Sequence, residues 1–241
     1  MSVSAILHEM LVSVAQALGE ELRNEMVFVG GCSTSLLITD DFTRENVRHT
    51  DDVDLIVNVL TYPDFHRLQE RLKNKGFVVR MPNPEEDIPA CAMFLGDLRV
   101  DFMPNNERVL GFSNRWYESA TQSAMPYSLT DDIVIKLVDP VYFVATKLEA
   151  YKGRGNNDPL ESRDIEDILN LFDGRKALLE EIERAPSDVK QYIAAEIFNL
   201  FNEPDFDYAV QAQSGGDKER EELIFERLER VATIYEGSMD E

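Results

Sequence analysis

The signals for β-strands end at Pro140, and this change divides the chain in two. Before it, short apolar runs alternate with amphipathic segments; after it, only helical periodicity remains. Strands are expected at residues 27–29, 53–59, 77–80, 91–95, 98–103, 127–129 and 133–137, with helices at 2–23 and 63–75 and a loop at 39–49. Later helices are expected at 140–152, 162–173, 175–184, 188–201 and 217–236. The sequence therefore predicts an α/β (α+β) chain, with a small mixed β-sheet core and flanking helices over residues 1–138 and a helical C-terminal lobe over 139–241.

Acidic residues outnumber basic ones. The chain has 46 Asp and Glu against 24 Lys and Arg, a net charge of −22 at pH 7. Such a field repels polyanions, so binding of DNA or RNA through bulk charge is excluded, and acidic membrane surfaces are disfavoured for the same reason. A local basic groove stays open, and the 44% of hydrophobic residues predict a folded, globular chain.

The two cysteines, Cys32 and Cys91, have no spacing typical of a zinc site or a disulfide framework. This usage predicts a reducing compartment. The N-terminus lacks the basic region of a signal peptide, and no apolar run reaches the ~18 residues of a membrane span. We expect a soluble, cytoplasmic protein without a membrane partner.

A glycine pair follows the first predicted strand. Gly30 and Gly31 separate that strand from a helix that starts near Ser33. Glycines at a strand-to-helix turn let backbone N–H groups approach a phosphate, and a helix N-terminus favours an anion. A tight turn that needs a positive φ explains the pair equally well.

Two aspartates lie at the start of the strand predicted at 53–59. Asp52 comes just before it, and Asp54 is its second residue. Residues two apart in a strand share a face, so these carboxylates lie about 7 Å apart and repel each other unless a cation compensates them. Mg²⁺ takes one or two carboxylates together with substrate phosphates. A solvent-facing acidic edge is the alternative, but the strand continues into the apolar run Leu55-Ile56-Val57.

Asp101 stands inside another alternating apolar strand, at 98–103. On its own, one aspartate in a hairpin is unremarkable. Together with the first two carboxylates, it could complete a metal site or orient an attacking hydroxyl.

The order of these elements resembles the DNA polymerase beta-like nucleotidyltransferase superfamily over residues 26–103. The resemblance implies Mg²⁺ (with Mn²⁺ as an alternative) bound by Asp52, Asp54 and Asp101. It also implies an NTP substrate whose phosphates are held by Gly30, Gly31 and Ser33. One departure is the long stretch between Ser33 and Asp52. Residues 39–49 look like an insertion, which would displace the glycine turn or form a lid with Arg44, Arg48 and His49.

Motifs in the helical half resemble the AbiEii/AbiGii family of nucleotidyltransferase toxins. Lys147 stands in Lys147-Leu148-Glu149-Ala150, and Asp164 follows Arg163, with Asp167 close enough to be confused with it. The resemblance implies that Lys147 holds the triphosphate and that Asp164 lies near the reacting groups. The helix spacing places Lys147 beside the apolar stripe, where it needs an anionic partner. That partner could be a phosphate or Asp164 itself.

These features predict a nucleotidyltransferase that moves NMP from an NTP to an acceptor hydroxyl. The AbiEii resemblance implies an RNA acceptor such as tRNA, a role as the toxin of a toxin–antitoxin or phage-defence system, and an antitoxin as partner. The alternatives are nucleotidylation of a small molecule or a protein, and a catalytically inactive nucleotide-binding module. A groove for RNA would need several basic residues on one face: Arg44, Arg48, Arg99, Lys136, Lys152 and Arg154.

Overall fold

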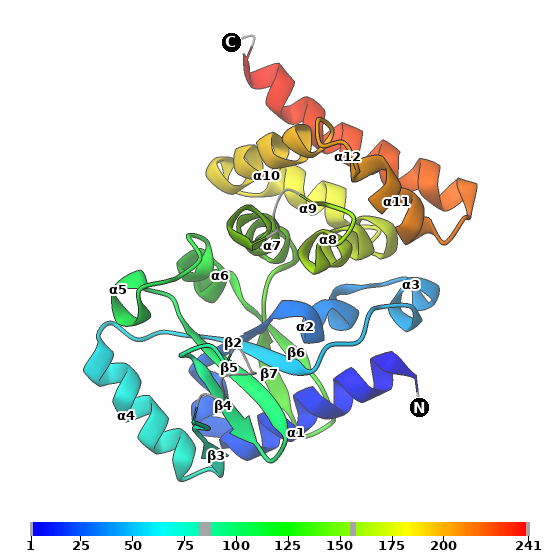
Figure 1. Ribbon diagram of the computed structural model, residues 1–241. Coiled ribbons are helices and arrows are strands. Elements are labelled where there is room, and N and C mark those ends of the chain that lie inside the picture. The colour runs from blue at the N-terminus through cyan, green and yellow to red at the C-terminus, as the bar shows by residue number, and fades with distance from the viewer. Residues whose placement is uncertain (1, 82–87, 155–157, 240–241) are drawn as a thin grey trace. The chain divides into compact units, whose positions relative to one another are not determined.

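The computed structural model describes residues 2–81, 88–154 and 158–239. The chain forms two compact units (Figure 1). The first comprises Met1–Ser33 and Arg48–Asp139, and the second comprises Thr34–Val47 and Pro140–Glu241. The second unit therefore includes a segment from early in the chain.

The first unit is built on a seven-stranded mixed sheet in the order β3-β4-β5-β2-β1-β7-β6. β2 pairs parallel with β5 and β1 parallel with β7, while the remaining neighbours are antiparallel. The strands are β1 (Met26–Val29), β2 (Asp52–Val57), β3 (Phe77–Val78), β4 (Ala92–Leu95), β5 (Leu98–Pro104), β6 (Met125–Ser128) and β7 (Val134–Leu137). The helices are α1 (Val3–Asn24), α4 (Tyr62–Lys73), α5 (Glu107–Leu110) and α6 (Tyr117–Ser123), and α2 (Gly30–Leu37) begins in this unit.

Helix α1 packs on the sheet against β7, β1 and β2 (Figure 1). Its apolar residues Leu7, Leu11, Val14 and Leu18 are fully buried, as their helical spacing predicts. Ser2 begins the helix by accepting a hydrogen bond from the N–H of Ala5. This packing fixes the central strands that carry the candidate site.

Helices joined by short turns, with no strand, make up the described residues of the second unit. It contains α3 (Asp41–Glu45), α7 (Pro140–Arg154), α8 (Arg163–Gly174), α9 (Leu178–Arg184), α10 (Ser187–Leu200), α11 (Phe206–Ser214) and α12 (Lys218–Met239). Helix α8 is its centre and contacts α7, α11, α12 and α3. Ile165, Ile168 and Phe172 of α8 are each at most 1% exposed.

The predicted α/β class is confirmed, and so is the change to helices alone after Pro140 in the described residues. Some local predictions were wrong. The expected loop at 39–49 contains α3, because Asp40 accepts a hydrogen bond from the N–H of Thr43 and so caps a short helix. Helix α11 was missed, although Phe206, Ala209 and Val210 bury a face at helical spacing.

None of the described helices combines the length and the apolar character that crossing a membrane requires.

Candidate functional site

Three carboxylates lie on two neighbouring strands of the first unit. The parallel pairing of β2 with β5 puts Asp54 opposite Asp101 and Asp52 opposite Arg99. Side chains opposite each other on adjacent strands point to the same face, as do residues two apart on one strand. The structure therefore brings Asp52, Asp54, Arg99 and Asp101 together. We call these four residues the carboxylate cluster.

Arg99, the basic residue of the cluster, pairs with two of its aspartates. Its guanidinium forms an ion pair with Asp52, and its Nε lies 3.3 Å from Oδ1 of Asp101. Thr50 donates a 2.6 Å hydrogen bond to the other oxygen of Asp52. Burial lowers the pKa of Arg99, but the charges of Asp101, Asp52 and Asp54 outweigh it, so the pKa stays raised. With three carboxylates and one guanidinium, the cluster keeps an excess of negative charge.

Gly30 lies directly against Asp54. Val29, at the end of β1, pairs with Asp54 across the antiparallel ladder, and Gly30 then turns into α2 with φ +73°. A Cβ at Gly30 would collide with the carboxylate of Asp54. The glycine is thus needed twice, for its left-handed backbone and for the close approach of a carboxylate.

We expect Gly30→Ala to lower the free energy of unfolding by more than the ~1–2 kcal/mol of backbone strain alone, because it also displaces Asp54. Gly96→Ala is the matched control. Gly96 has φ +60° but no atom within 4 Å of its Cβ position. Urea unfolding of the two variants separates the collision from the strain; equal losses would show that Asp54 does not press on Gly30.

Gly31 and Ser33 continue from Gly30 into the first turns of α2. Both residues are buried. The Ser33 hydroxyl donates a 2.8 Å hydrogen bond to the carbonyl of Val29. The first N–H groups of a helix have no intrahelical partner, so the backbone at Gly30 and Gly31 can offer donors to an anion.

The oxygens of the carboxylate cluster are the kind of ligand that Mg²⁺ prefers. Among the described residues, no group of three or more His, Cys, Asp or Glu side chains is arranged as a metal site. The cluster therefore contains no preformed cage. Mg²⁺ usually binds through one or two carboxylates, water and phosphate oxygens, and the hard oxygens of the cluster fit such a partial ligand set.

Lys147 and Asp164 form a second cluster, in the helical unit. Lys147 is 7% exposed, and its Nζ lies 3.1 Å from Asp164 and 2.6 Å from Asp167. Arg154 donates two 2.9 Å hydrogen bonds to Asp164, and Thr34 donates one of 3.3 Å to Asp167. The sequence left two partners for Lys147, a phosphate or Asp164. In the structure Lys147 pairs with Asp164 and also with Asp167. The two clusters belong to different units of the chain.

Asp164 should make stability depend on pH. Burial raises the pKa of Asp164, but Lys147 and Arg154 together lower it by more than burial raises it. The folded-state pKa is therefore below the usual value. A depressed carboxyl pKa stabilises the fold above the unfolded-state pKa, and this contribution is lost as pH falls through the folded-state pKa. The difference in unfolding free energy between the wild type and Asp164→Asn should hold above pH ~5 and shrink below pH ~4. Urea unfolding between pH 2.5 and 7 checks this; a difference independent of pH would contradict it.

The segment before Asp52 is fastened within the second unit. Backbone N–H groups of Thr39 and Asp40 donate to the carbonyl of Gly174, at 3.0 and 2.9 Å. Arg220 forms ion pairs with Asp173, at 2.6 Å, and with Asp40. A Cβ at Gly174 would lie 2.6 Å from Ile38, so the segment packs tightly on the end of α8. The part of the insertion that carries α3 is thus held by α8 and α12, which does not fit a mobile lid.

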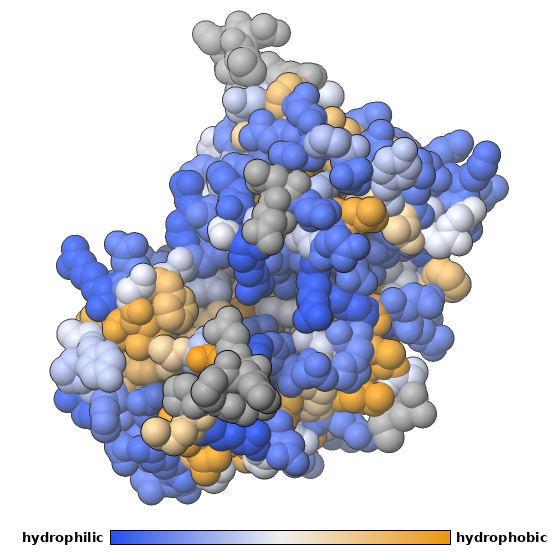
Figure 2. Space-filling model, viewed as in Figure 1, coloured by the Kyte–Doolittle hydropathy of each residue, from blue (hydrophilic) through white to orange (hydrophobic). Residues whose placement is uncertain are grey.

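Several of the basic residues considered for an RNA groove are paired with acids. Arg44 pairs with Asp41, Lys152 with Glu196, Arg154 with Asp164, and Arg99 with Asp52 and Asp101. The face seen in Figure 2 is mostly hydrophilic, with smaller apolar areas between. The positive charge offered to a polyanion is therefore smaller than the number of basic residues suggests.

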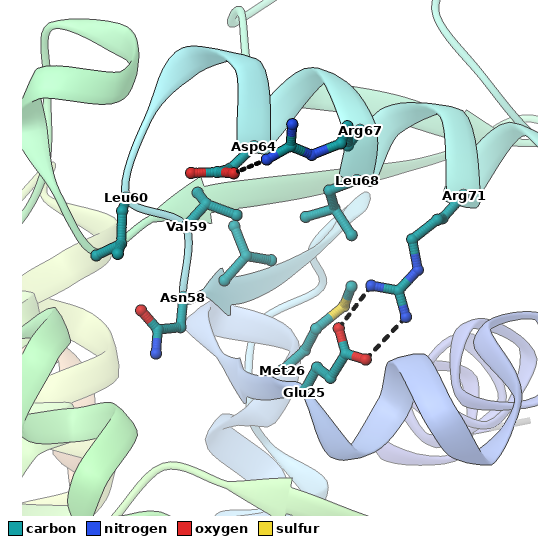
Figure 3. A pocket seen from close by; sticks show the side chains of 10 residues that line it. Glu25, Met26, Asn58, Val59, Leu60, Asp64, Arg67, Leu68 and Arg71 are labelled. Atoms are coloured by element: carbon teal, nitrogen blue, oxygen red, sulfur yellow. Dashed lines mark hydrogen bonds and ion pairs between the residues drawn. The ribbon is translucent and has the colours of Figure 1, made fainter.

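A cavity of about 420 Å³ lies at the other end of β1 and β2 (Figure 3). Its floor is apolar, with Met26, Val59 and Leu68, and two arginines stand at its side. Arg67 pairs with Asp64, and Arg71 pairs with Glu25 and Glu21. The charged groups of this cavity compensate one another, and none of the predicted site residues lines it.

Sequence reasoning missed three members of these clusters in their observed roles. The sequence suggests Arg99 as a groove residue, Arg154 as a groove residue or a phosphate contact, and Asp167 only as a residue confused with Asp164. For Arg99 a signal existed, because it precedes Asp101 by two residues in a predicted strand and must share its face.

No protein-family model matches the chain, and no curated protein matches its sequence. In structure, the chain is similar to an antigenic nucleotidyltransferase-like protein from Paracoccidioides brasiliensis. The two are 19% identical, with a TM-score of 0.44, over 86% of this chain and 91% of that chain. A likeness at this level carries no argument about activity, so function has to come from the residues of the site.

Proposed function

We propose that this protein is a Mg²⁺-dependent nucleotidyltransferase, which transfers NMP from an NTP to an acceptor hydroxyl and releases pyrophosphate. One observation carries the proposal. Asp54 and Asp101 stand opposite each other on parallel strands, Asp52 shares their face, and Gly30 opens α2 against Asp54. Carboxylates next to the N-terminus of a helix suit a metal-bound triphosphate.

The chain's own groups divide the work. Asp52, Asp54 and Asp101 would hold Mg²⁺ or Mn²⁺, which when bound neutralises the triphosphate and polarises the α-phosphorus. The N–H groups at Gly30 and Gly31 donate to the β- and γ-phosphates. Ser33 joins them if its hydroxyl proton leaves the Val29 carbonyl, to which it now donates.

Asp101 is suited to orient the acceptor. Its side chain is 9% exposed, so its position is well defined. The acceptor oxygen attacks the α-phosphorus, its proton passes to a carboxylate or to water, and the bond from the α-phosphorus to the bridging oxygen breaks. Positioning and electrostatics supply most of the rate, since the protein forms no covalent bond to the substrate.

Lys147 and Asp164 enter the proposal through the AbiEii resemblance alone, as a triphosphate ligand and a second carboxylate near the reacting groups. For the first role, Lys147 must exchange a carboxylate for a phosphate. Lys147 now pairs with Asp164 and Asp167. The competing role for Lys147 is therefore that of an ion-pair anchor within the helical unit.

The proposed acceptor is RNA, such as tRNA. The proposed biological role is that of a toxin whose partner is an antitoxin. This part of the proposal also depends on the AbiEii resemblance. The net charge of −22 and the paired basic residues weigh against a long polyanion. A short, structured acceptor end, contacted through few phosphates, suits the protein better than a long strand.

Label transfer from each α-³²P-NTP, with Mg²⁺ and total cellular RNA, tests the function. Wild type is compared with Asp52→Asn and with Asp51→Asn, whose carboxylate is 95% exposed and lies outside the cluster. Label on an RNA band with the wild type and Asp51→Asn, but not with Asp52→Asn, supports the proposal. Label on the protein itself or on an added aminoglycoside moves the acceptor to another class. No nucleotide-dependent label with any acceptor contradicts the enzyme.

A further inference from the structure

Arg99 lies among the carboxylates that would hold a metal ion. It stands on β5 opposite Asp52 and two residues before Asp101, on the same face. Its guanidinium pairs with Oδ2 of Asp52 and with Oδ1 of Asp101. These oxygens are also the ligands that the proposed function gives to a divalent cation.

A guanidinium and a divalent cation compete for such oxygens. Both need the lone pairs of the same carboxylates, and their positive charges repel each other at short range. Each oxygen of the Asp52 carboxylate already has one partner, because Thr50 donates to Oδ1 while Arg99 pairs with Oδ2. A cation that takes Oδ2 of Asp52 and Oδ1 of Asp101 would lie next to the guanidinium of Arg99 and compete with it for these oxygens.

Arg99 has both the freedom and the chemistry to move. Its side chain is 34% exposed, whereas that of Asp101 is 9% exposed. Guanidinium groups bind phosphate oxygens with the same paired geometry as carboxylates. A triphosphate placed at Gly30, next to the cluster, offers Arg99 a second set of oxygens.

We propose that Arg99 is a positioning residue that sets the divalent-cation affinity of the carboxylate cluster: it competes with the cation until nucleotide phosphates draw it away. This inference rests on the proposed function, and it adds that cation and nucleotide bind cooperatively through Arg99. The coupling is reciprocal, so each ligand should tighten the other by the same factor.

The test measures Mn²⁺ binding by the EPR signal of free Mn²⁺, with and without an α,β-methylene NTP analogue. Arg99→Gln should bind Mn²⁺ about tenfold more tightly than the wild type without nucleotide, because one positive charge next to the ion is removed. The tightening caused by the analogue should be smaller in Arg99→Gln than in the wild type. Arg99→Lys, which keeps the charge but loses the paired donors, should fall between the two.

Arg80→Gln is the control, since Arg80 pairs with Asp97 in the β4–β5 turn, away from the cluster. It should bind Mn²⁺ as the wild type does. Circular dichroism of each variant shows that it is folded; should Arg99→Gln not fold, Arg99→Lys carries the comparison.

The outcomes separate this inference from the proposed function. Equal or weaker Mn²⁺ binding by Arg99→Gln overturns the inference, because Arg99 would then organise the carboxylates instead of competing with the cation. If Asp54→Asn binds Mn²⁺ as the wild type does, Asp54 is not a cation ligand, and the proposed function, which gives it that role, fails whatever Arg99 does. Loss in Asp54→Asn together with gain in Arg99→Gln supports both.

Discussion

Replacing Asp54 with asparagine should lower nucleotidyl transfer by about 10³-fold, the equivalent of the several kcal/mol that a lost metal ligand removes from transition-state stabilisation. The side chain keeps its shape, so Gly30 still packs against it and β2 keeps its pairing with β5. One of three mutually repelling carboxylates becomes neutral. The free energy of unfolding should therefore stay unchanged or increase.

Activity and stability should thus respond differently to Asp54→Asn. A residue needed only for structure loses activity and stability together, whereas a carboxylate kept for its charge loses activity alone. The measurements are label transfer at saturating Mg²⁺ and the urea unfolding midpoint of the same preparation. Asp97→Asn is the exposed control in the first unit, and it should change neither quantity. An Asp54→Asn variant within threefold of wild-type activity would remove Asp54 from the site.

Local sequence reasoning was sufficient for part of this site. The period of a strand places Asp52 and Asp54 on one face, and the buried run after them places that strand in the sheet. The register between β2 and β5 was beyond such reasoning, because it joins strands separated by α4, β3 and β4. That register puts Asp101 opposite Asp54 and Arg99 opposite Asp52.

The sequence predicted one of the two reasons for the glycine at position 30. A glycine pair between a strand and a helix predicts a left-handed turn, and Gly30 has one. The second reason for the glycine, contact with Asp54, depends on the pairing of β1 with β2. Gly174 is a similar case in the helical unit, where a segment far away in sequence packs on it. No local pattern marks such contacts, because the partner comes from tertiary packing.

The insertion shows the same limit at a larger scale. Residues 39–49 are polar and were expected to form a loop, yet α3 lies within them. The cap at Asp40 was a local signal for this helix. The ion pairs of Arg220 with Asp40 and Asp173, which attach this segment to the helical unit, had no local signal. Arg220 lies 180 residues after Asp40 in the sequence.

Lys147 gives the largest stability effect expected from a single substitution. Lys147→Met should lower the free energy of unfolding by about 3–5 kcal/mol, because it leaves two buried carboxylates with too little positive charge. Asp164 keeps Arg154 as a partner, but Asp167, at 1% exposed, loses its cation. Lys152→Met is the matched control on the same helix. Lys152 pairs with Glu196 and is 49% exposed, so this variant should lose less than about 1 kcal/mol.

The same pair of variants decides between the two roles of Lys147. An ion-pair anchor predicts that the double variant Lys147→Met/Asp167→Asn regains part of the stability, because the buried carboxylate that lost its ion pair with Lys147 is now neutral. A triphosphate ligand predicts that the double variant, although more stable, still requires a higher NTP concentration for half-maximal label transfer. Stability regained together with an unchanged NTP requirement would leave Lys147 as the anchor that fixes α7 to α8, and the phosphates would then depend on the groups around Gly30.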